Sequence, residues 1–278
     1  MPARDFAARA ERFSALAQAS PMAPYLRFLA AIAAAQDRAA AVLPDPALPA
    51  PDALALRAEH GMPLLTVDML GDDPVFAATL DWFAANPVEG ATAEAEAARL
   101  NLLALPAAER LALAEAVFAG GFPADRLGEA LYVAAAVQVH AAREAALLDP
   151  ALLHRAEIGA CPVCGGAPVA SVRVGWPRAE KLRYCACALC GTYWNYVRVK
   201  CTACASTKGV SYYGIEAGRR GIGAECCEEC RSYIKHLRQD EDVAIDPFAD
   251  DAGSYELDVM LRAEGYRRAG LNPLFVIG

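Results

Sequence analysis

Cysteine is confined to one stretch of this sequence, where it occurs in regularly spaced pairs. All ten cysteines lie between residues 161 and 230 of the 278-residue chain. Twenty-two residues separate the first C-x-x-C pair from the second, and 22 separate the third from the fourth, so the two halves repeat at an offset of 40. Two such pairs at this kind of spacing are typical of zinc-ribbon sites, here with slightly longer arms. The pairs are Cys161/Cys164, Cys187/Cys190, Cys201/Cys204 and Cys227/Cys230.

We assign these pairs to two tetrahedral metal sites in sequence order. Each C-x-x-C turn (a knuckle) supplies two thiolates at about 2.3 Å from the ion, and two knuckles complete a site. The arm between them can run out and back as strands, so that the metal holds a small sheet with little core. A pairing of the second knuckle with the third, through a ten-residue arm, is the alternative. Site one is Cys161, Cys164, Cys187 and Cys190, and site two is Cys201, Cys204, Cys227 and Cys230.

The two sites differ in the residue that follows the second cysteine of each knuckle. In site one these residues are Gly165 and Gly191. Glycine permits a positive φ, which lets backbone N–H groups point at sulfur. Site two has Ala205 and Arg231 instead. We therefore expect site two to be more strained and to hold its metal less firmly, and its cysteines are candidates for redox chemistry.

Two cysteines stand outside the pairs. Cys185 and Cys226 each lie just before the second knuckle of a site. We expect them to be small buried residues. The alternative is a thiol that exchanges with a metal ligand or resolves a mixed disulfide.

Residues 1–155 are rich in alanine and have apolar residues at spacings of three and four, which predicts amphipathic helices packed as a bundle. Prolines between residues 44 and 51 indicate an irregular connection. The predicted helices cover residues 3–19, 24–42, 73–85, 93–105, 107–119 and 125–148.

After residue 161 the pattern changes to short runs of β-branched and aromatic residues. These predict strands near 172–176, 193–199 and 210–215. An acidic stretch from 240 to 251 leads into a helix predicted over 252–264. We expect its acidic residues to form a solvated face or a helix cap, with docking onto the basic module or onto a partner as the alternative.

The fold class is therefore α+β, with a helical bundle, two tandem Cys₄ modules and a C-terminal helix. We place the helical domain at 1–155, the first module at 156–198 and the second at 199–240. The C-terminal acidic segment and helix cover 241–278.

Charge is segregated along the chain. The formal net charge is −8, yet residues 161–238 carry 12 Lys/Arg against five Asp/Glu. Two divalent ions in eight thiolates contribute −4, so much of the basic excess offsets charge at the sites. The overall negative charge argues against a protein that binds nucleic acid. Nucleic-acid binding remains the alternative explanation for these basic residues.

The sequence gives no sign of export or catalysis. It has no apolar run of about 20 residues and no secretory signal, so we expect a cytoplasmic protein with no membrane partner. In a reducing compartment, clustered cysteines favour metal binding over disulfides. Common nucleotide-binding, zinc-protease and serine-hydrolase motifs are absent.

Four histidines complete the set of candidate ligands. His60 and His140 lie in helical-looking stretches, and we expect them to be paired or packed residues. His154 and His236 flank the cysteines and are candidates for contacts with the ligating thiols.

The cysteine-rich sequence resembles the FdhE family of formate dehydrogenase accessory proteins. The resemblance covers residues 161 to 275, and over residues 1–155 it consists of length and helical character. It is carried by the segments 161–171, 183–194, 197–204 and 224–235, and by Ala249–Ala252, Glu264–Tyr266 and Asn272-Pro273.

This resemblance implies a non-catalytic cytoplasmic protein that matures respiratory formate dehydrogenases and contacts their catalytic subunit. It also implies two rubredoxin-like modules that bind iron through the eight paired cysteines. Zinc fits the same ligands, because both metals accept tetrahedral thiolate. The alternatives are a rubredoxin-like electron carrier or thiol redox protein, and a double zinc ribbon that binds nucleic acid. Self-association is a further partner class that the sequence leaves open.

Overall fold

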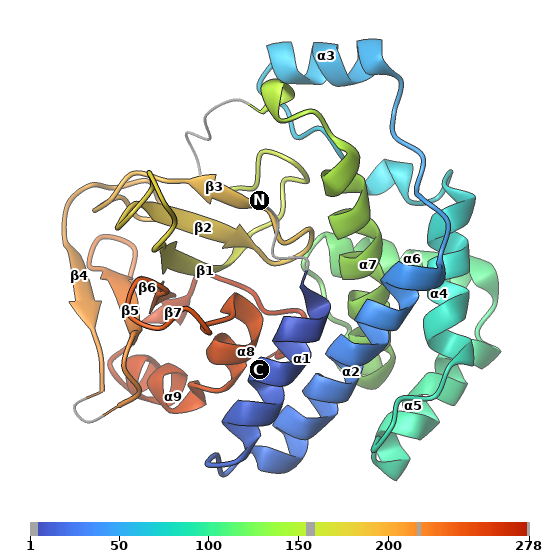
Figure 1. The fold of residues 1–278 in the computed structure, drawn as a ribbon, viewed down its shortest axis with the longest axis horizontal. Helices are drawn as coiled ribbons and strands as arrows, with labels where there is room; N and C mark the ends of the chain where they lie inside the picture. The colour runs from blue at the N-terminus through green and yellow to red at the C-terminus, as the bar shows by residue number, and fades with distance from the viewer. Residues whose placement is uncertain (1–4, 154–158, 216–217, 277–278) are drawn as a thin grey trace.

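The computed structural model describes residues 5–153, 159–215 and 218–276 (Figure 1). Residues 5–153 form a helical side, and the described residues from 159 onward form a sheet side. The helices are α1 (Phe6–Ala17), α2 (Ala23–Val42), α3 (Pro51–Glu59), α4 (Pro74–Ala85), α5 (Ala93–Ala104), α6 (Ala107–Phe118), α7 (Leu127–Leu147), α8 (Pro247–Ala252) and α9 (Tyr255–Ala263). The strands are β1 (Pro168–Arg173), β2 (Arg183–Cys187), β3 (Tyr193–Asn195), β4 (Val210–Tyr213), β5 (Ile222–Cys227), β6 (Ser232–Arg238) and β7 (Arg267–Arg268). The predicted α+β class is confirmed.

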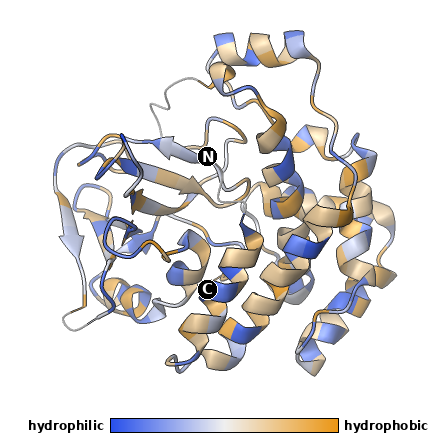
Figure 2. Ribbon diagram, viewed as in Figure 1, coloured by the Kyte–Doolittle hydropathy of each residue, from blue (hydrophilic) through white to orange (hydrophobic). Residues whose placement is uncertain are grey.

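Helix α7 forms the centre of the helical side. It contacts α2, α4, α5 and α6, and its residues from Val133 to Ala142 are all buried. Most side chains in this stretch are apolar, with Gln138 and His140 as polar exceptions, and Figure 2 shows hydrophobic colour over much of α2 and α7. None of the described helices combines the length and the apolar character needed to cross a membrane.

Short polar side chains begin several helices by accepting hydrogen bonds from unpaired backbone N–H groups. Asp5 caps α1, Thr92 caps α5, and Asp73 caps α4 directly before Pro74. The cap at Asp73 confirms the prediction made from the sequence. The predicted ranges for the other long helices agree with the structure to within a few residues.

Two helices were not predicted, and both begin at a proline. Pro51 starts α3 inside the expected irregular connection, and Pro247 starts α8 inside the acidic stretch. Proline is tolerated at the first helical position because its missing N–H would have no partner there. We interpreted Pro51 only as part of an irregular connection and the stretch around Pro247 only by its acidic residues, so the helices that these prolines begin were missed.

The strands in the described ranges form one sheet, in the order β3-β2-β1-β6-β5-β4 with β7 beside β6. Each cysteine-rich half contributes an antiparallel meander, and the two halves repeat the same topology at the 40-residue offset. They join where β1 pairs with β6 in parallel, with Ser171 opposite His236. The tandem modules therefore share a continuous sheet.

The two halves pack against different neighbours. The cysteines of site one belong to the same buried cluster as the helices of the N-terminal region. On the second half, α9 places Leu257 and Leu261 against Tyr233 and Cys226. The first half is thus built into the helical side and also packs against Phe248 of α8, whereas the second half is covered by α9.

The acidic stretch is not a solvated face over its whole length, and that expectation is wrong for Asp250 and Asp251. Both are fully buried. Asp250 pairs with Arg12 and Arg219, which links α1 and the second module. Asp246 does cap α8, as expected for part of the stretch. The buried Asp250 and Asp251 dock onto the basic module instead, which is the alternative that the sequence left open.

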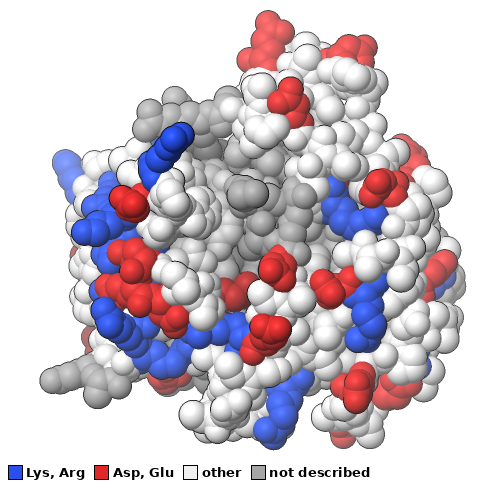
Figure 3. All heavy atoms as spheres, in the orientation of Figure 1, with Lys and Arg blue, Asp and Glu red and all other residues white. Residues whose placement is uncertain are grey.

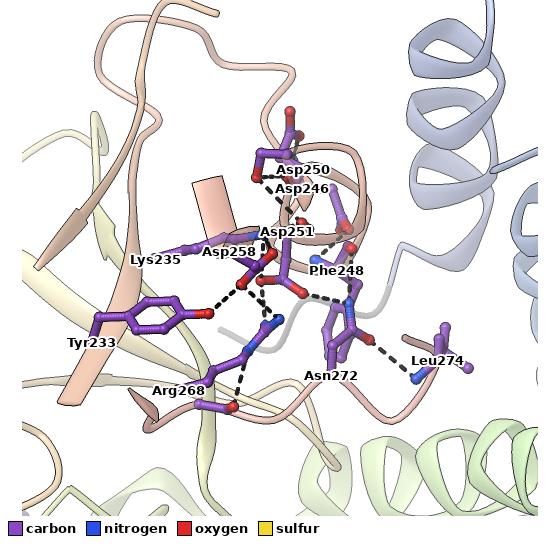
Figure 4. A network of polar contacts seen from close by, with 12 residues as sticks. Tyr233, Lys235, Asp246, Phe248, Asp250, Asp251, Asp258, Arg268, Asn272 and Leu274 are labelled. Carbon is purple, nitrogen blue, oxygen red and sulfur yellow. Dashed lines mark hydrogen bonds and ion pairs between the residues drawn. The ribbon is translucent and has the colours of Figure 1, made fainter. Parts of the chain in front are cut away.

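Figure 4 shows how Asp251 and Asp258 are held in this packing. Lys235 Nζ lies 2.6 Å from Asp258 Oδ2, and Tyr233 donates to Asp258 Oδ1 at 2.7 Å. Arg268 pairs with both aspartates, and Asn272 donates to Asp251 Oδ2 at 2.9 Å. The C-terminal segment is therefore fixed on the sheet by charged groups that are hydrogen-bonded and paired.

Candidate metal centres

Site one is assembled from the loop before β1 and the turn after β2. Its sulfurs lie 3.6 Å apart between Cys161 and Cys190, 3.4 Å between Cys164 and Cys187, and 3.5 Å between Cys164 and Cys190. All four side chains are buried. The backbone N–H of Leu189 points at Cys187 Sγ at 3.4 Å, which is the type of contact expected of a knuckle.

Site two repeats this arrangement between the loop before β4 and the turn after β5. The Cys201 and Cys230 sulfurs lie 3.7 Å apart, as do those of Cys204 and Cys227. The Ala203 N–H points at Cys201 Sγ at 3.4 Å. In contrast to site one, Cys204 is exposed and Cys230 is half-buried.

The structure brings the eight paired cysteines together in sequence order, and no cluster forms across the halves among the described residues. A disulfide would need sulfurs about 2.05 Å apart. Four thiolates at about 2.3 Å from a shared ion lie about 3.75 Å from one another, close to the distances found here. The residues therefore fit a tetrahedral thiolate site for iron or zinc, and the structure does not distinguish these metals.

One thiol in each site is next to a hydroxyl group at the matching position. Cys190 Sγ lies 3.2 Å from Thr192 Oγ1, and Cys230 Sγ lies 2.9 Å from Ser232 Oγ. Burial alone would raise the pKa of the Cys230 thiol, but hydrogen bonds from Ser232 and the neighbouring thiols lower it to about 7. The pKa of Cys190 is lowered by the same kind of contacts against its burial. These thiols are the ones most easily converted to ligating thiolates.

Comparison with known proteins agrees with this geometry. Family models described as FdhE N-terminal, FdhE central domain and FdhE C-terminal domain match residues 1–157, 160–198 and 199–275. A protein FdhE homolog of Rhizobium meliloti is 41% identical, with 99% of this chain and 91% of the relative covered. The chain belongs to the FdhE family. A homolog from Cronobacter sakazakii is 36% identical over 97% of this chain and 87% of its own length.

The fold is also that of a solved FdhE structure. The crystal structure of the FdhE protein from Pseudomonas aeruginosa matches with a TM-score of 0.89 and 33% identity. The match covers 100% of this chain and 98% of that chain. The arrangement of helices and sheet described here is thus similar to that of the Pseudomonas aeruginosa protein.

In this FdhE family member, the helical side encloses site one. The Leu65 N–H donates to Val163 O at 2.8 Å, inside the first knuckle. Gln138 of α7 donates to Ala188 O at 2.8 Å, inside the second knuckle. Site one therefore joins the helical side to the sheet, whereas Cys204 of site two is exposed.

The expected strain in site two is confirmed. Ala205 and Arg231 adopt φ values of 60° and 53°, in the left-handed region that favours glycine. The matching residues of site one, Gly165 and Gly191, have φ values of 72° and 66°. The four knuckles thus share one backbone conformation. In site two, non-glycine residues adopt this conformation although it is sterically unfavourable for them. Weaker metal retention remains a prediction.

The two unpaired cysteines lie in the interior and outside both sites. Cys185 and Cys226 are fully buried, and burial raises the pKa of each thiol to about 12. Neither belongs to the clusters of potential ligands found among the described residues. Their environment is that expected of small buried residues.

His236 does not contact a ligating thiol in the described structure. Its Nδ1 lies 3.0 Å from Glu225 Oε1 and 3.2 Å from Ser171 Oγ. Arg183 pairs with the same Glu225, so this buried network joins the halves across the β1–β6 contact. His154 lies outside the described residues.

Sequence reasoning missed a third cluster of potential ligands, Asp73, His140 and Glu144. Burial lowers the pKa of His140 to about 4 and raises that of Glu144 to about 8. The spacing His140-x-x-x-Glu144 places both on one helix face and could have been noticed. Asp73 comes from a distant element, and the sequence contains no sign of that contact.

Proposed function

We propose that this FdhE family member is an accessory factor for the maturation of a respiratory formate dehydrogenase, acting in the cytoplasm by binding the catalytic subunit. In this proposal the protein is not an enzyme, and its eight paired cysteines hold two iron ions. The observation that carries the proposal is the pair of Cys₄ clusters in a chain that matches FdhE proteins over nearly its whole length.

The environments of the two sites support different uses of the metals. Site one is buried in the core shared with the helices, so its metal would stabilise the contact between the helical side and the sheet. Site two has one exposed and one half-buried cysteine, so a partner or a redox agent could reach it. Iron in this site is the better candidate for sensing the state of the partner.

The charges on the sheet side support a protein partner more than a nucleic acid. Arg173 pairs with Asp240 and Glu241, and Arg238 also pairs with Glu241. Figure 3 shows positive and negative side chains intermingled on this side of the face drawn. A surface in which arginines are already paired offers little net attraction to phosphates.

The proposal is tested by deleting the gene from its native host and by a direct binding measurement. Deletion should abolish respiratory formate oxidation, and the wild-type gene should restore it. The protein purified anaerobically from native expression should contain iron and bring the catalytic subunit with it. Normal formate oxidation in the deletion strain would overturn the proposal.

The second candidate function is a thiol redox protein or rubredoxin-like electron carrier. The exposure of Cys204 and the lowered pKa of Cys230 favour it. Reversible redox cycling of the purified protein, together with unimpaired formate dehydrogenase maturation in the deletion strain, would support it over the accessory role. Loss of maturation without redox cycling would exclude it.

A further inference from the structure

Three ionisable side chains meet inside the helical side, away from all ten cysteines in the sequence. Asp73 is the cap of α4, while His140 and Glu144 lie one turn apart on α7. Their exposed fractions are 8%, 1% and 5%. One ligand atom from each lies within 4.8 Å of the others. Two carboxyl groups and an imidazole are thus concentrated where water is excluded.

The polar atoms of this cluster face one another without forming hydrogen bonds. His140 Nε2 is 3.5 Å from Asp73 Oδ2 and 3.6 Å from Glu144 Oε2, which is longer than a hydrogen bond between such groups. Neither ring nitrogen of His140 nor Asp73 Oδ2 has a hydrogen-bond partner among the described residues. Buried polar atoms are nearly always satisfied, so this cluster needs a group that the protein does not supply.

In the described parts of the chain no Lys or Arg forms an ion pair with Asp73 or Glu144, although the charge of Arg143 is close enough to contribute to the lowered pKa of His140. Arg143, next to the cluster in sequence, directs its guanidinium to Leu43 O at 2.8 Å and to Asp45 at 3.2 Å. Phe76 packs its ring edge-on against the His140 ring, with the centroids 5.1 Å apart. The imidazole is therefore held in place by an apolar contact, with Nε2 directed at the carboxylates.

We propose that Asp73, His140 and Glu144 bind a divalent first-row transition-metal ion, of which Zn²⁺ and Fe²⁺ are the best matches. An imidazole nitrogen and carboxylate oxygens suit such ions. Ligands at about 2.0–2.1 Å in a tetrahedral site lie about 3.4 Å apart, close to the 3.5 and 3.6 Å found from His140. Three protein ligands leave a coordination position for water or another ligand.

The position of this third site connects it to site one. Gln138, on the same helix as His140 and Glu144, donates to Ala188 O between Cys187 and Cys190. An ion bound here would join the start of α4 to the segment of α7 that supports the second knuckle.

The experiment is a Co²⁺ titration of the full-length protein, prepared metal-free under reducing anaerobic conditions. Cobalt in the cysteine sites gives intense thiolate-to-metal absorption, whereas cobalt bound by nitrogen and oxygen gives only weak bands. The wild-type protein should bind a third equivalent after the thiolate absorption is complete. His140→Gln and Glu144→Gln should lose that equivalent and keep the full thiolate absorption, which also shows that the variants are folded.

Two further variants make the result decisive. His60→Gln removes an exposed histidine at the end of α3 and should keep the third equivalent. Asp73→Asn keeps a side chain able to cap α4 but removes a charge, so it should weaken binding of the third equivalent at least tenfold. Saturation of the wild-type protein at two equivalents, or a third equivalent that survives His140→Gln and Glu144→Gln, would overturn the proposal.

Discussion

The residue after the second cysteine of each knuckle adopts a left-handed backbone, whether or not it is glycine. The φ values are 72° and 66° at the glycines of site one, and 60° at Ala205 and 53° at Arg231. A non-glycine residue in this region costs roughly 1–2 kcal/mol. Because the strain arises at the turn that directs N–H groups toward sulfur, it acts directly on the geometry of site two.

We predict that Ala205→Gly stabilises site two. Relief of about 1–2 kcal/mol of strain outweighs the roughly 0.4–1 kcal/mol by which glycine favours the unfolded chain. The net gain of up to about 1.6 kcal/mol should appear as a higher denaturation midpoint and slower metal release to a chelator. Ala203→Gly, at an exposed position in the same knuckle without positive φ, should destabilise the protein instead. Equal effects of the two substitutions would contradict the strain argument.

The site residues show what sequence can and cannot predict at this scale. The eight paired cysteines were found because their chemistry and regular spacing are visible along the chain. The strain at Ala205 was also visible, as a glycine absent from a matching position. The contact of Asp73 with His140 depends on the packing of α4 against α7, which no local pattern records.

At the scale of elements, the C-terminal segment depends on buried charge. Asp251 of α8 is fully buried, and burial opposes its ionisation. Arg268 and Lys235 overcome that effect, together with a hydrogen bond from Asn272, and lower the pKa of Asp251 below its ordinary value of 3.8. The carboxylate therefore holds α8, β6 and β7 together in its charged form.

We predict that Asp251→Asn destabilises the protein at pH 7 by about 3 kcal/mol or more, because it leaves buried cations partly unpaired. A carboxyl group with a lowered folded pKa stabilises the fold fully above its unfolded pKa of 3.8, and that contribution is lost as pH falls through the folded pKa. The difference between wild type and variant, measured by urea denaturation, should thus be large at neutral pH and shrink below pH 4. Asp37→Asn, on the exposed face of α2, should leave stability nearly unchanged. A pH-independent difference at Asp251 would contradict this account.

The C-terminal segment also shows where the prediction of helices and strands failed. The helices with strong periodicity were located correctly, since their apolar positions recur over several turns. The short helix α8 was missed because acidic residues and a proline dominate its sequence, while its buried aspartates are stabilised by arginines outside the helix, Arg12 near the N-terminus and Arg268 near the C-terminus. The parallel pairing of β1 with β6 was not predictable either, because it joins strands from opposite ends of the cysteine-rich region.

At the scale of the whole molecule, two chemically similar sites occupy different environments. Site one shares a core with the helices, whereas site two lies on the half covered by α9 and leaves Cys204 exposed. The sequence predicted two sites, and it predicted from the missing glycines which of them is strained. It could not show that the first site is enclosed by α7 and the segment around Leu65, because that depends on how the helical side meets the sheet.

This difference predicts an ordered loss of metal from the two cysteine sites. A chelator under reducing conditions should remove the metal of site two first, because its ligands can be reached without unfolding the rest of the protein. Metal in site one should leave more slowly, since its release requires the knuckles to separate from Gln138 and Leu65. Release followed by an indicator dye should therefore show two phases, with the helical circular dichroism signal retained through the first.

Matched cysteine variants assign those phases. Cys204→Ser should remove the fast phase and leave the slow phase and the contact between helices and sheet intact. Cys164→Ser should remove the slow phase and also lower the thermal midpoint more, because Cys164 is part of the core shared with the helices. Structural metal sites contribute folding free energy directly, so the variant that loses the enclosed metal should be the less stable of the two. A single release phase in the wild type, or equal thermal midpoints in the two variants, would show that the environments do not control metal retention.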